Sequence, residues 1–187
     1  MVHASLRAIG RNLVLFLGIS LVFAFGAKAQ DVVVGTIDKV DTGAKTVAVK
    51  TADGTVTTVK YTDKTALHGL GDAAHGADLA GKTGGRVIVH DVPEGTDKVA
   101  RSIVYVGDKT VDKTDGTIFK IGKRTKTVSV KMADNTVKVF TISSHATVNA
   151  GKDVFKYSAV TMKEGDHVVV YSTDEAGKSI AHVFEHF

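Results

Sequence analysis

The strongest constraint on the fold of this chain is an internal repeat with an offset of 81 residues. Residues 35–56 align with residues 116–137 without a gap, and thirteen of these 22 positions are identical. The same offset aligns residues 84–89 with residues 165–170. Self-similarity at a fixed period indicates a repeated structural unit. The sequence therefore predicts two related units, near residues 31–107 and 112–187.

Each unit has the pattern of five β-strands. Val47 and Val49 alternate with polar or small residues, which is the period of two of a half-buried strand. Asp53 and Gly54 then supply the positive φ angles of a tight hairpin, and Asn135 replaces Gly54 in the second unit. The predicted strands of the first unit are residues 32–40, 46–51, 55–62, 86–91 and 98–106. The second unit repeats this order and ends with a strand at residues 179–186.

The connection between the third and fourth strands is the one place that favours a short helix. Asp153 can cap residues 154–160 in the second unit, whereas residues 72–80 of the first unit are rich in alanine and glycine and favour a helix less. Three strands, a helical crossing and two strands are the order of an OB-type barrel, with an SH3-like barrel as the alternative. We predict an all-β protein of two tandem five-stranded OB-like barrels, residues 30–107 and 116–187, joined by a polar linker at residues 108–115.

Residues 1–29 have the composition of an export signal. Arg7 and Arg11 precede an uncharged apolar run at residues 13–25, and Ala27-Lys28-Ala29 is a small-x-small cleavage pattern. The alternative, an uncleaved membrane anchor, requires about 20 apolar residues. We predict a signal peptide cleaved after Ala29 and a location in the periplasm or outside the cell. Contact with the membrane is then expected only through this segment before cleavage.

Charge and cysteine content exclude several classes of function. Cleavage removes three basic residues and no acidic residue, so the net formal charge falls from +4 to +1. A chain this balanced has no general attraction for nucleic acid, and we expect no nucleic-acid partner. The absence of cysteine excludes disulfides, cysteine nucleophiles and cysteine-ligated zinc. An envelope protein or a small ligand, neither identified, is the expected partner.

A recurring pattern of glycine, threonine and valine connects the units to a known group of domains. In the first unit it consists of Gly35-Thr36-Ile37, Lys45-Thr46-Val47-x-Val49, Asp53-Gly54-Thr55, Leu79 and Gly84-x-x-Val87-x-Val89. This pattern resembles the exported bacterial OB-like domains grouped as DUF5666. The resemblance covers nearly all of the chain after residue 29. It implies an exported barrel and no particular activity.

A weaker resemblance is to periplasmic copper-chaperone barrels, which have a similar strand pattern. Those barrels bind Cu(I) through a histidine, a Met-x-Met pair and a neighbouring tryptophan, and soft thioether ligands select Cu(I). This chain has no tryptophan and no Met-x-Met pair, and Met132 and Met162 are far apart in the pattern. The resemblance therefore does not extend to the copper ligands.

Histidines supply the candidate metal ligands. His68 and His75 flank the loop before the fourth strand of the first unit, where Asp72 and Asp78 could join them. Imidazole and carboxylate groups suit Zn(II) or Ni(II). The alternative is a polar loop with solvated histidines. At the offset of 81 no histidine of one unit matches a histidine of the other, so these residues are not a shared feature of both units.

Catalytic constellations are weak in this sequence. Ser143, Ser144 and His145 are adjacent, and adjacent residues of a strand point apart, so they do not form a Ser-His-Asp arrangement. We predict a non-enzymatic protein without a cofactor. By analogy with OB barrels, the hairpin loops 41–45, 93–97, 122–126 and 174–178 are candidate binding rims. The hypothesis is an exported binding or scaffold module of the bacterial cell envelope, with a periplasmic transition-metal-binding protein as the alternative.

Overall fold

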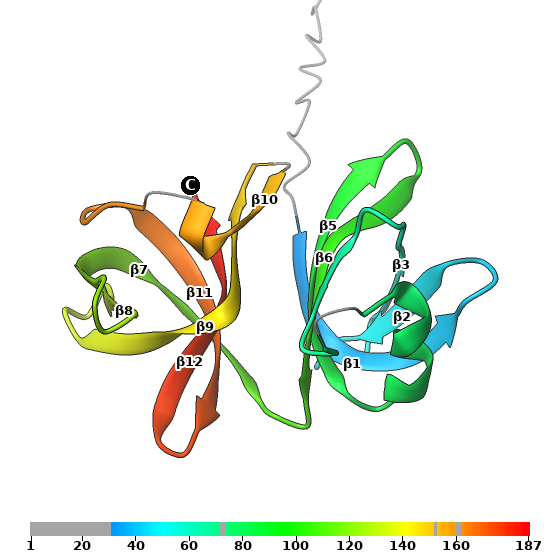
Figure 1. Ribbon diagram of the computed structural model, residues 1–187, viewed down its shortest axis with the longest axis horizontal. Helices are drawn as coiled ribbons and strands as arrows, with labels where there is room; N and C mark the ends of the chain where they lie inside the picture. Colours follow the sequence, from blue (N-terminus) through cyan, green and yellow to red (C-terminus); the bar gives the residue numbers. More distant parts are fainter. Residues whose placement is uncertain (1–30, 72–73, 152, 160–161) are drawn as a thin grey trace, which may run out of the picture.

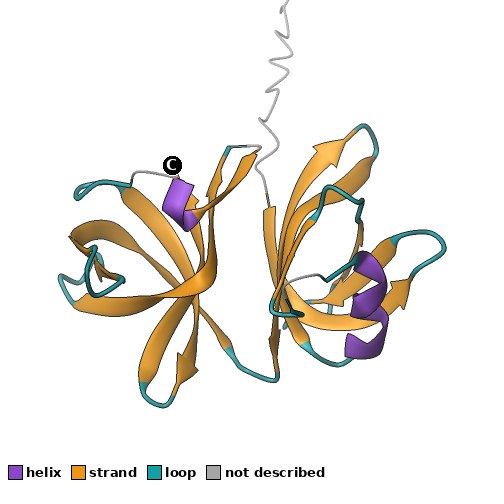
Figure 2. Cartoon of the chain, in the orientation of Figure 1, coloured by secondary structure: helices purple, strands orange, loops and turns teal. Residues whose placement is uncertain are grey.

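The computed structural model describes residues 31–71, 74–151, 153–159 and 162–187, in two β-barrels (Figure 1). Almost all regular structure in these residues is strand, with two short 3-10 helices (Figure 2). The predicted all-β class with two barrels is confirmed. The predicted signal peptide lies outside the described residues. Among the residues that are described, no helix has both the length and the apolar character needed to cross a bilayer.

The first barrel is closed by five strands. Its elements are β1 (Asp31–Asp41), β2 (Thr46–Lys50), β3 (Val56–Lys60), β4 (Ala66–His68), η1 (Gly76–Lys82), β5 (Arg86–Glu94) and β6 (Asp97–Gly107). Strand β1 pairs antiparallel with β2 and with β5, and β2 pairs antiparallel with β3. The barrel closes where β3 pairs parallel with β6, which pairs antiparallel with β5. The short β4 extends the parallel pairing along β6.

The second barrel repeats this arrangement. Its elements are β7 (Val111–Gly122), β8 (Thr127–Lys131), β9 (Val137–Ala150), β10 (Asp153–Lys156), η2 (Tyr157–Ala159), β11 (His167–Glu175) and β12 (Lys178–His186). Closure is again parallel, between β9 and β12. Parallel pairing of the third and fifth barrel strands is the OB arrangement, so the OB prediction is confirmed over the SH3-like alternative.

The duplication extends to individual hydrogen bonds. The Ile37 N–H donates to the Gly85 carbonyl at 2.8 Å, and at the same offset the Ile118 N–H donates to the Asp166 carbonyl at 2.9 Å. The hairpin residues Gly54 and Asn135 have φ angles of 87° and 66°, as predicted for a tight turn. Both units therefore share their backbone geometry as well as their strand order.

Close approach of two strands explains one glycine of the repeated pattern. A Cβ atom placed on Gly35 would lie 2.4 Å from the carbonyl oxygen of Lys50, and one on Gly116 would lie 2.4 Å from that of Lys131. Real Cβ atoms do not approach this closely, so only glycine fits at either position. Both glycines lie in the first strand of their barrel.

Two predictions about the segments between strands need correction. Residues 153–156, predicted as the start of a capped helix, form strand β10 on the end of β9, and only residues 157–159 form a helical turn. The longer 3-10 helix is in the first unit, at residues 76–82, where the sequence favoured a helix less. The linker is also shorter than predicted, because residues 111–115 already pair with β11 as part of β7.

Three hydrophobic clusters hold the molecule together. One fills each barrel, around Ile37 and Leu79 in the first and around Phe140 and Phe184 in the second. The third lies between the barrels, where outward-facing residues of β5 and β6 meet those of β11 and β12. Its buried members are Ile88, Val104, Val106, Val169, Tyr171 and Val183. Burial of apolar area at about 25 cal/mol per Å² favours a fixed association of the two barrels.

Candidate ligand-binding pocket of the second barrel

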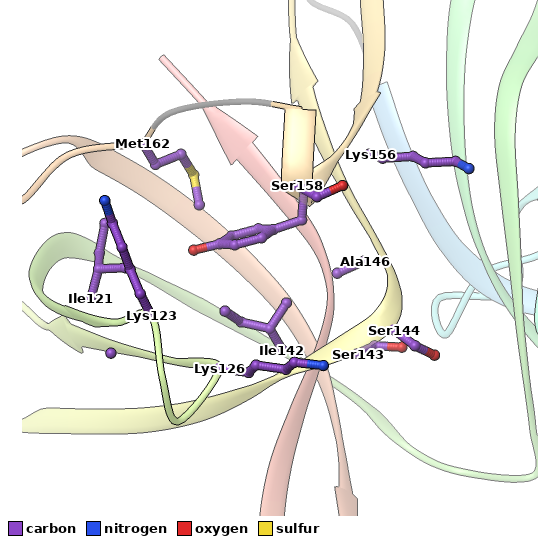
Figure 3. Close-up of a pocket in the computed structure, with 12 residues that line it drawn as sticks. Ile121, Lys123, Lys126, Ile142, Ser143, Ser144, Ala146, Lys156, Ser158 and Met162 are labelled. Atoms are coloured by element: carbon purple, nitrogen blue, oxygen red, sulfur yellow. The ribbon is translucent and has the colours of Figure 1, made fainter.

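A pocket of about 610 Å³ lies at one end of the second barrel (Figure 3). Its walls come from the end of β7, the β7–β8 turn, the middle of β9, and η2. Pockets that bind small molecules usually have volumes of about 300–1,000 Å³. This one is therefore large enough for a ligand of two or three rings or a short acyl chain.

The inner wall of the pocket is apolar. Ile121, Ile142 and Tyr157 pack against the core of the second barrel, and Met162 belongs to that core. The ring of Tyr157 contacts the ring of Phe184, with centroids 5.2 Å apart. Burial raises the pKa of the Tyr157 phenol above its ordinary value, so the phenol is protonated and can donate a hydrogen bond at neutral pH.

The rim of the pocket carries positive charge and hydroxyl groups. Lys123 and Lys126 come from the β7–β8 turn, and Ser143 and Ser144 come from β9. Lys156 also belongs to the rim, but Figure 3 shows its side chain pointing toward the first barrel. Among the described residues that line the pocket, none is acidic. The rim is therefore suited to an anionic group.

The corresponding place in the first barrel is closed. Ile142 matches Tyr61 at the offset of 81, and the Tyr61 side chain is 5% exposed within the first core. Its ring packs directly on Gly76 of η1, where an added Cβ would lie 2.1 Å from the ring. Leu79 of the same helix is fully buried beneath it. The Tyr61 ring thus fills this place in the first barrel, whereas in the second barrel Tyr157 replaces Gly76 and its ring lies in the wall of an open pocket.

The hairpin that carries Lys126 is anchored to the pocket wall. The Ile142 N–H donates to the Lys126 carbonyl at 2.8 Å, as the Tyr61 N–H does to the Lys45 carbonyl. Lys126 has a φ of 51° and Lys45 a φ of 52°, so the two turns have the same backbone form. Residues 122–126 had been predicted as a candidate rim, and three of them line this pocket.

The structure describes three of the four predicted metal ligands, His68, His75 and Asp78. The ring of His68 stacks on that of His145 in the second barrel, with centroids 5.9 Å apart. The Asp78 carboxylate instead accepts a hydrogen bond from the His75 backbone at 2.8 Å, and Asp72 lies outside the described residues. Within the described part of the chain, no three His, Asp or Glu side chains are grouped so as to hold a metal ion. The metal site stays a prediction.

A second, smaller cavity brings histidines of both barrels together. It has a volume of about 370 Å³, and His68, His145 and His182 lie in its wall. Burial, with smaller contributions from the positive charges of His145 and Lys156, lowers the pKa of His68. His182 also has a lowered pKa, mainly because of burial, and its Nε2 lies 2.9 Å from the Thr173 hydroxyl. The His68 and His182 imidazoles are therefore predominantly neutral at pH 7.

Sequence reasoning did not find the main pocket, although a signal for it exists. The two units differ at the wall positions, Tyr61 against Ile142, and at the rim positions, Asp63 against Ser144. A side chain that becomes smaller and a carboxylate that is lost, at matching positions of a duplicated fold, indicate an opened and more positive site. Ser143 and Ser144 belong to the continuous strand β9.

Comparison with known proteins gives matches among solved structures alone. No protein-family model and no curated protein matches the chain, so the resemblance to the DUF5666 domains stays a prediction. The apo form of CusF from Escherichia coli is similar at 15% identity and a TM-score of 0.33, over 42% of this chain and 89% of that one. A silver(I) form of CusF has 15% identity and a TM-score of 0.32, over 42% and 99%.

A third similar structure is a copper(II) form of an Escherichia coli CusF variant with alanine in place of tryptophan. It has 16% identity and a TM-score of 0.32, over 44% of this chain and 96% of that one. Each match thus covers under half of the chain and nearly the whole of the solved protein. A likeness at these values bears on neither the ligand nor the activity of this chain.

Proposed function

We propose that this protein is an exported, non-enzymatic binding module of the bacterial cell envelope, and that its ligand site is the pocket of the second barrel. One observation carries the proposal: the pocket is open in the second barrel, while Tyr61 fills the same place in the first. The tyrosine of this place is Tyr61 in the first barrel and Tyr157, which matches Gly76, in the second, so the two units offer an internal comparison between a sealed barrel and an open one. The signal-like residues 1–29 support export.

The chemistry of the pocket supports binding without catalysis. Its described lining residues offer hydroxyl and ammonium groups, and none is a carboxylate or an imidazole. A serine hydroxyl needs a neighbouring general base to act as a nucleophile. On this proposal, the Ser143 and Ser144 hydroxyls accept or donate hydrogen bonds to a bound molecule.

The neutral fluorescent probe N-phenyl-1-naphthylamine tests whether the pocket binds apolar molecules. We expect saturable binding to the purified protein, and Ile142→Tyr should weaken it at least tenfold because the larger ring occupies part of the pocket. Val139→Tyr is the matched control, since Val139 lies on the same strand and is 56% exposed. Equal affinity of the wild type and Ile142→Tyr in a fluorescence titration would contradict the proposal.

Transition-metal binding is the second candidate function, and the contact between His68 and His145 favours it. Neutral imidazoles are good ligands for Zn(II), Ni(II) and copper. On this proposal, the first-barrel residues His68, His75, Asp72 and Asp78 hold the ion, with His145 as a neighbour.

Thermal unfolding of the tag-free protein tests this second function. One of the three metal ions should raise the melting temperature by several degrees, because a ligand that binds only the folded state stabilises it by about 2.7 kcal/mol at a hundredfold excess over Kd. The double variant His68→Ala/His75→Ala should lose this shift. An unchanged melting temperature with all three ions would exclude the metal function.

A further inference from the structure

We propose that the ligand of the second-barrel pocket is an apolar molecule with one anionic group, such as a carboxylate or sulfonate, and that Lys126 binds this group. The inference rests on the proposed function and specifies the chemical class of its ligand. It follows from comparing the charges of the two barrels at equivalent positions.

The first barrel neutralises the lysine of its hairpin internally. The Lys45 Nζ lies 3.0 Å from Asp63 Oδ1, on the first residues after β3. At the offset of 81, Lys45 corresponds to Lys126 and Asp63 corresponds to Ser144. Asp41 of the first barrel is likewise replaced by Gly122. The second barrel has therefore kept the cation and lost both nearby carboxylates.

The Lys126 ammonium is available to a ligand. Its Nζ atom takes part in no hydrogen bond or ion pair within the described residues, and the same holds for Lys123. The backbone of Lys126 is held in place by the hydrogen bond from Ile142. The hairpin is braced further by the Thr125 hydroxyl, which lies 2.8 Å from that of Thr127. The backbone that carries this cation is therefore held in place next to an apolar wall.

The combination of wall and rim selects the ligand class. A small hydrophilic anion would leave the surfaces of Ile142, Tyr157 and Met162 uncovered, whereas a neutral apolar molecule would leave Lys126 unpaired. A molecule with an apolar body and one anionic end satisfies both. The hydroxyls of Ser143 and Ser144 and the Tyr157 phenol add donors for the oxygen atoms of the anion. The body of the ligand also shields the ion pair from water, which strengthens it.

Two dyes with one scaffold separate the anionic contribution from the apolar one. The probe 1-anilinonaphthalene-8-sulfonate is N-phenyl-1-naphthylamine with a sulfonate added. We expect the wild-type protein to bind the sulfonated dye about tenfold more tightly than the neutral dye. Added salt should weaken only the sulfonated dye, because salt screens the attraction between the sulfonate and the lysines of the rim.

Two substitutions then remove the proposed interaction in different ways. Ser144→Asp recreates the carboxylate of the first barrel beside Lys126, and Lys126→Asn removes the cation while keeping a residue suited to positive φ. Each should lower the preference of the protein for the sulfonated dye over the neutral dye about tenfold. Lys131→Ala is the control for net charge, because Lys131 ends β8 and does not line the pocket. It should change neither affinity.

The outcomes distinguish the two proposals. Equal affinity of both dyes for the wild type, with both lost in Ile142→Tyr, would overturn the anion proposal and leave the binding function standing. Failure of both dyes to bind would overturn the binding function and the anion proposal with it. Equal weakening of both dyes by Ser144→Asp and Lys126→Asn would overturn the role of Lys126. Circular dichroism of each variant checks that it is folded.

Discussion

Replacing Gly116 with alanine is expected to destabilise the second barrel by about 3 kcal/mol. The new Cβ would lie 2.4 Å from the Lys131 carbonyl oxygen and 2.7 Å from a methyl group of Val130. Neither neighbour is the free end of a flexible side chain, because one is backbone and the other is buried core. Relief requires β7 and β8 to separate, and overpacking of this kind typically costs about 1–3 kcal/mol or more. Gly35→Ala should have an effect of the same size in the first barrel.

Urea unfolding monitored by circular dichroism measures this effect. Gly81→Ala is the control, since a Cβ there meets nothing within 4 Å, and its free energy of unfolding should stay within about 0.5 kcal/mol of the wild type. A loss below about 1 kcal/mol for both Gly35→Ala and Gly116→Ala would show that the paired strands do not approach as closely as described.

Lowering the pH from 7 to 4 is expected to remove about 3 kcal/mol of stability through His90 alone. Burial, together with the positive charge of Arg101, lowers the pKa of His90 from 6.5 to about 4. The side chain is 1% exposed, and neither ring nitrogen has a hydrogen-bond partner among the described residues. Each unit of pKa difference between the folded and unfolded states corresponds to about 1.4 kcal/mol.

The sign of this effect follows from where the proton binds. Below pH 6.5 the unfolded chain takes up a proton on His90, whereas the folded protein keeps the ring neutral down to about pH 4. Protons therefore favour the unfolded state throughout this window. Stability is complete above pH 6.5, falls as the pH decreases, and loses no more through this group below pH 4.

Urea titrations at several pH values, with His90→Gln as the comparison, isolate the contribution of His90. Glutamine is neutral at all these pH values and has a similar size. The difference in free energy of unfolding between the wild type and His90→Gln should change by about 3 kcal/mol between pH 7 and pH 4. His182, whose pKa is also lowered by burial, acts in the same direction in both proteins. The same pH dependence in both would contradict the assignment to His90.

Strands and hairpins could be predicted from the sequence because their determinants are local. Val47 and Val49 alternate along β2 and are fully buried, as a half-buried strand requires. Gly54 and Asn135 have the positive φ angles that their turns need. The repeat then allowed each weak assignment in one unit to be checked against the other. Local chemistry and the duplication together were sufficient for the order of the barrel strands.

The segment before η2 was predicted wrongly because its structure depends on a distant partner. Asp153 is a good helix cap, but Val154 and Phe155 favour strands, and they pair with Asn149 and Val148 on the long end of β9. Strand β4 of the first unit corresponds to residues 147–149 of β9, and both segments pair parallel with the last strand of their barrel. Which partner a short segment finds is decided by tertiary packing, and hydrophobic periodicity does not contain that information.

The pocket depends on an exchange of side chains between the units, from Tyr61 and Gly76 to Ile142 and Tyr157, which a search for motifs does not detect. Ile142 is an ordinary strand residue by itself. Its role appears only by comparison with the matching residue Tyr61, whose ring packs against Gly76. The candidate metal ligands were chosen by residue type and proximity in sequence, and His68 then proved to face His145 of the other barrel. Functional sites of this kind are defined by differences between the units.

The apolar cluster between the barrels has a consequence for resistance to proteases. Because Ile88 and Val104 of one barrel share their burial with Val169 and Tyr171 of the other, opening either barrel exposes part of its neighbour. The two unfolding equilibria are therefore linked. A molecule held at the end of the second barrel also makes the first barrel harder to open, and hence harder for a protease to cleave. Such a molecule would stabilise the first barrel without contacting it.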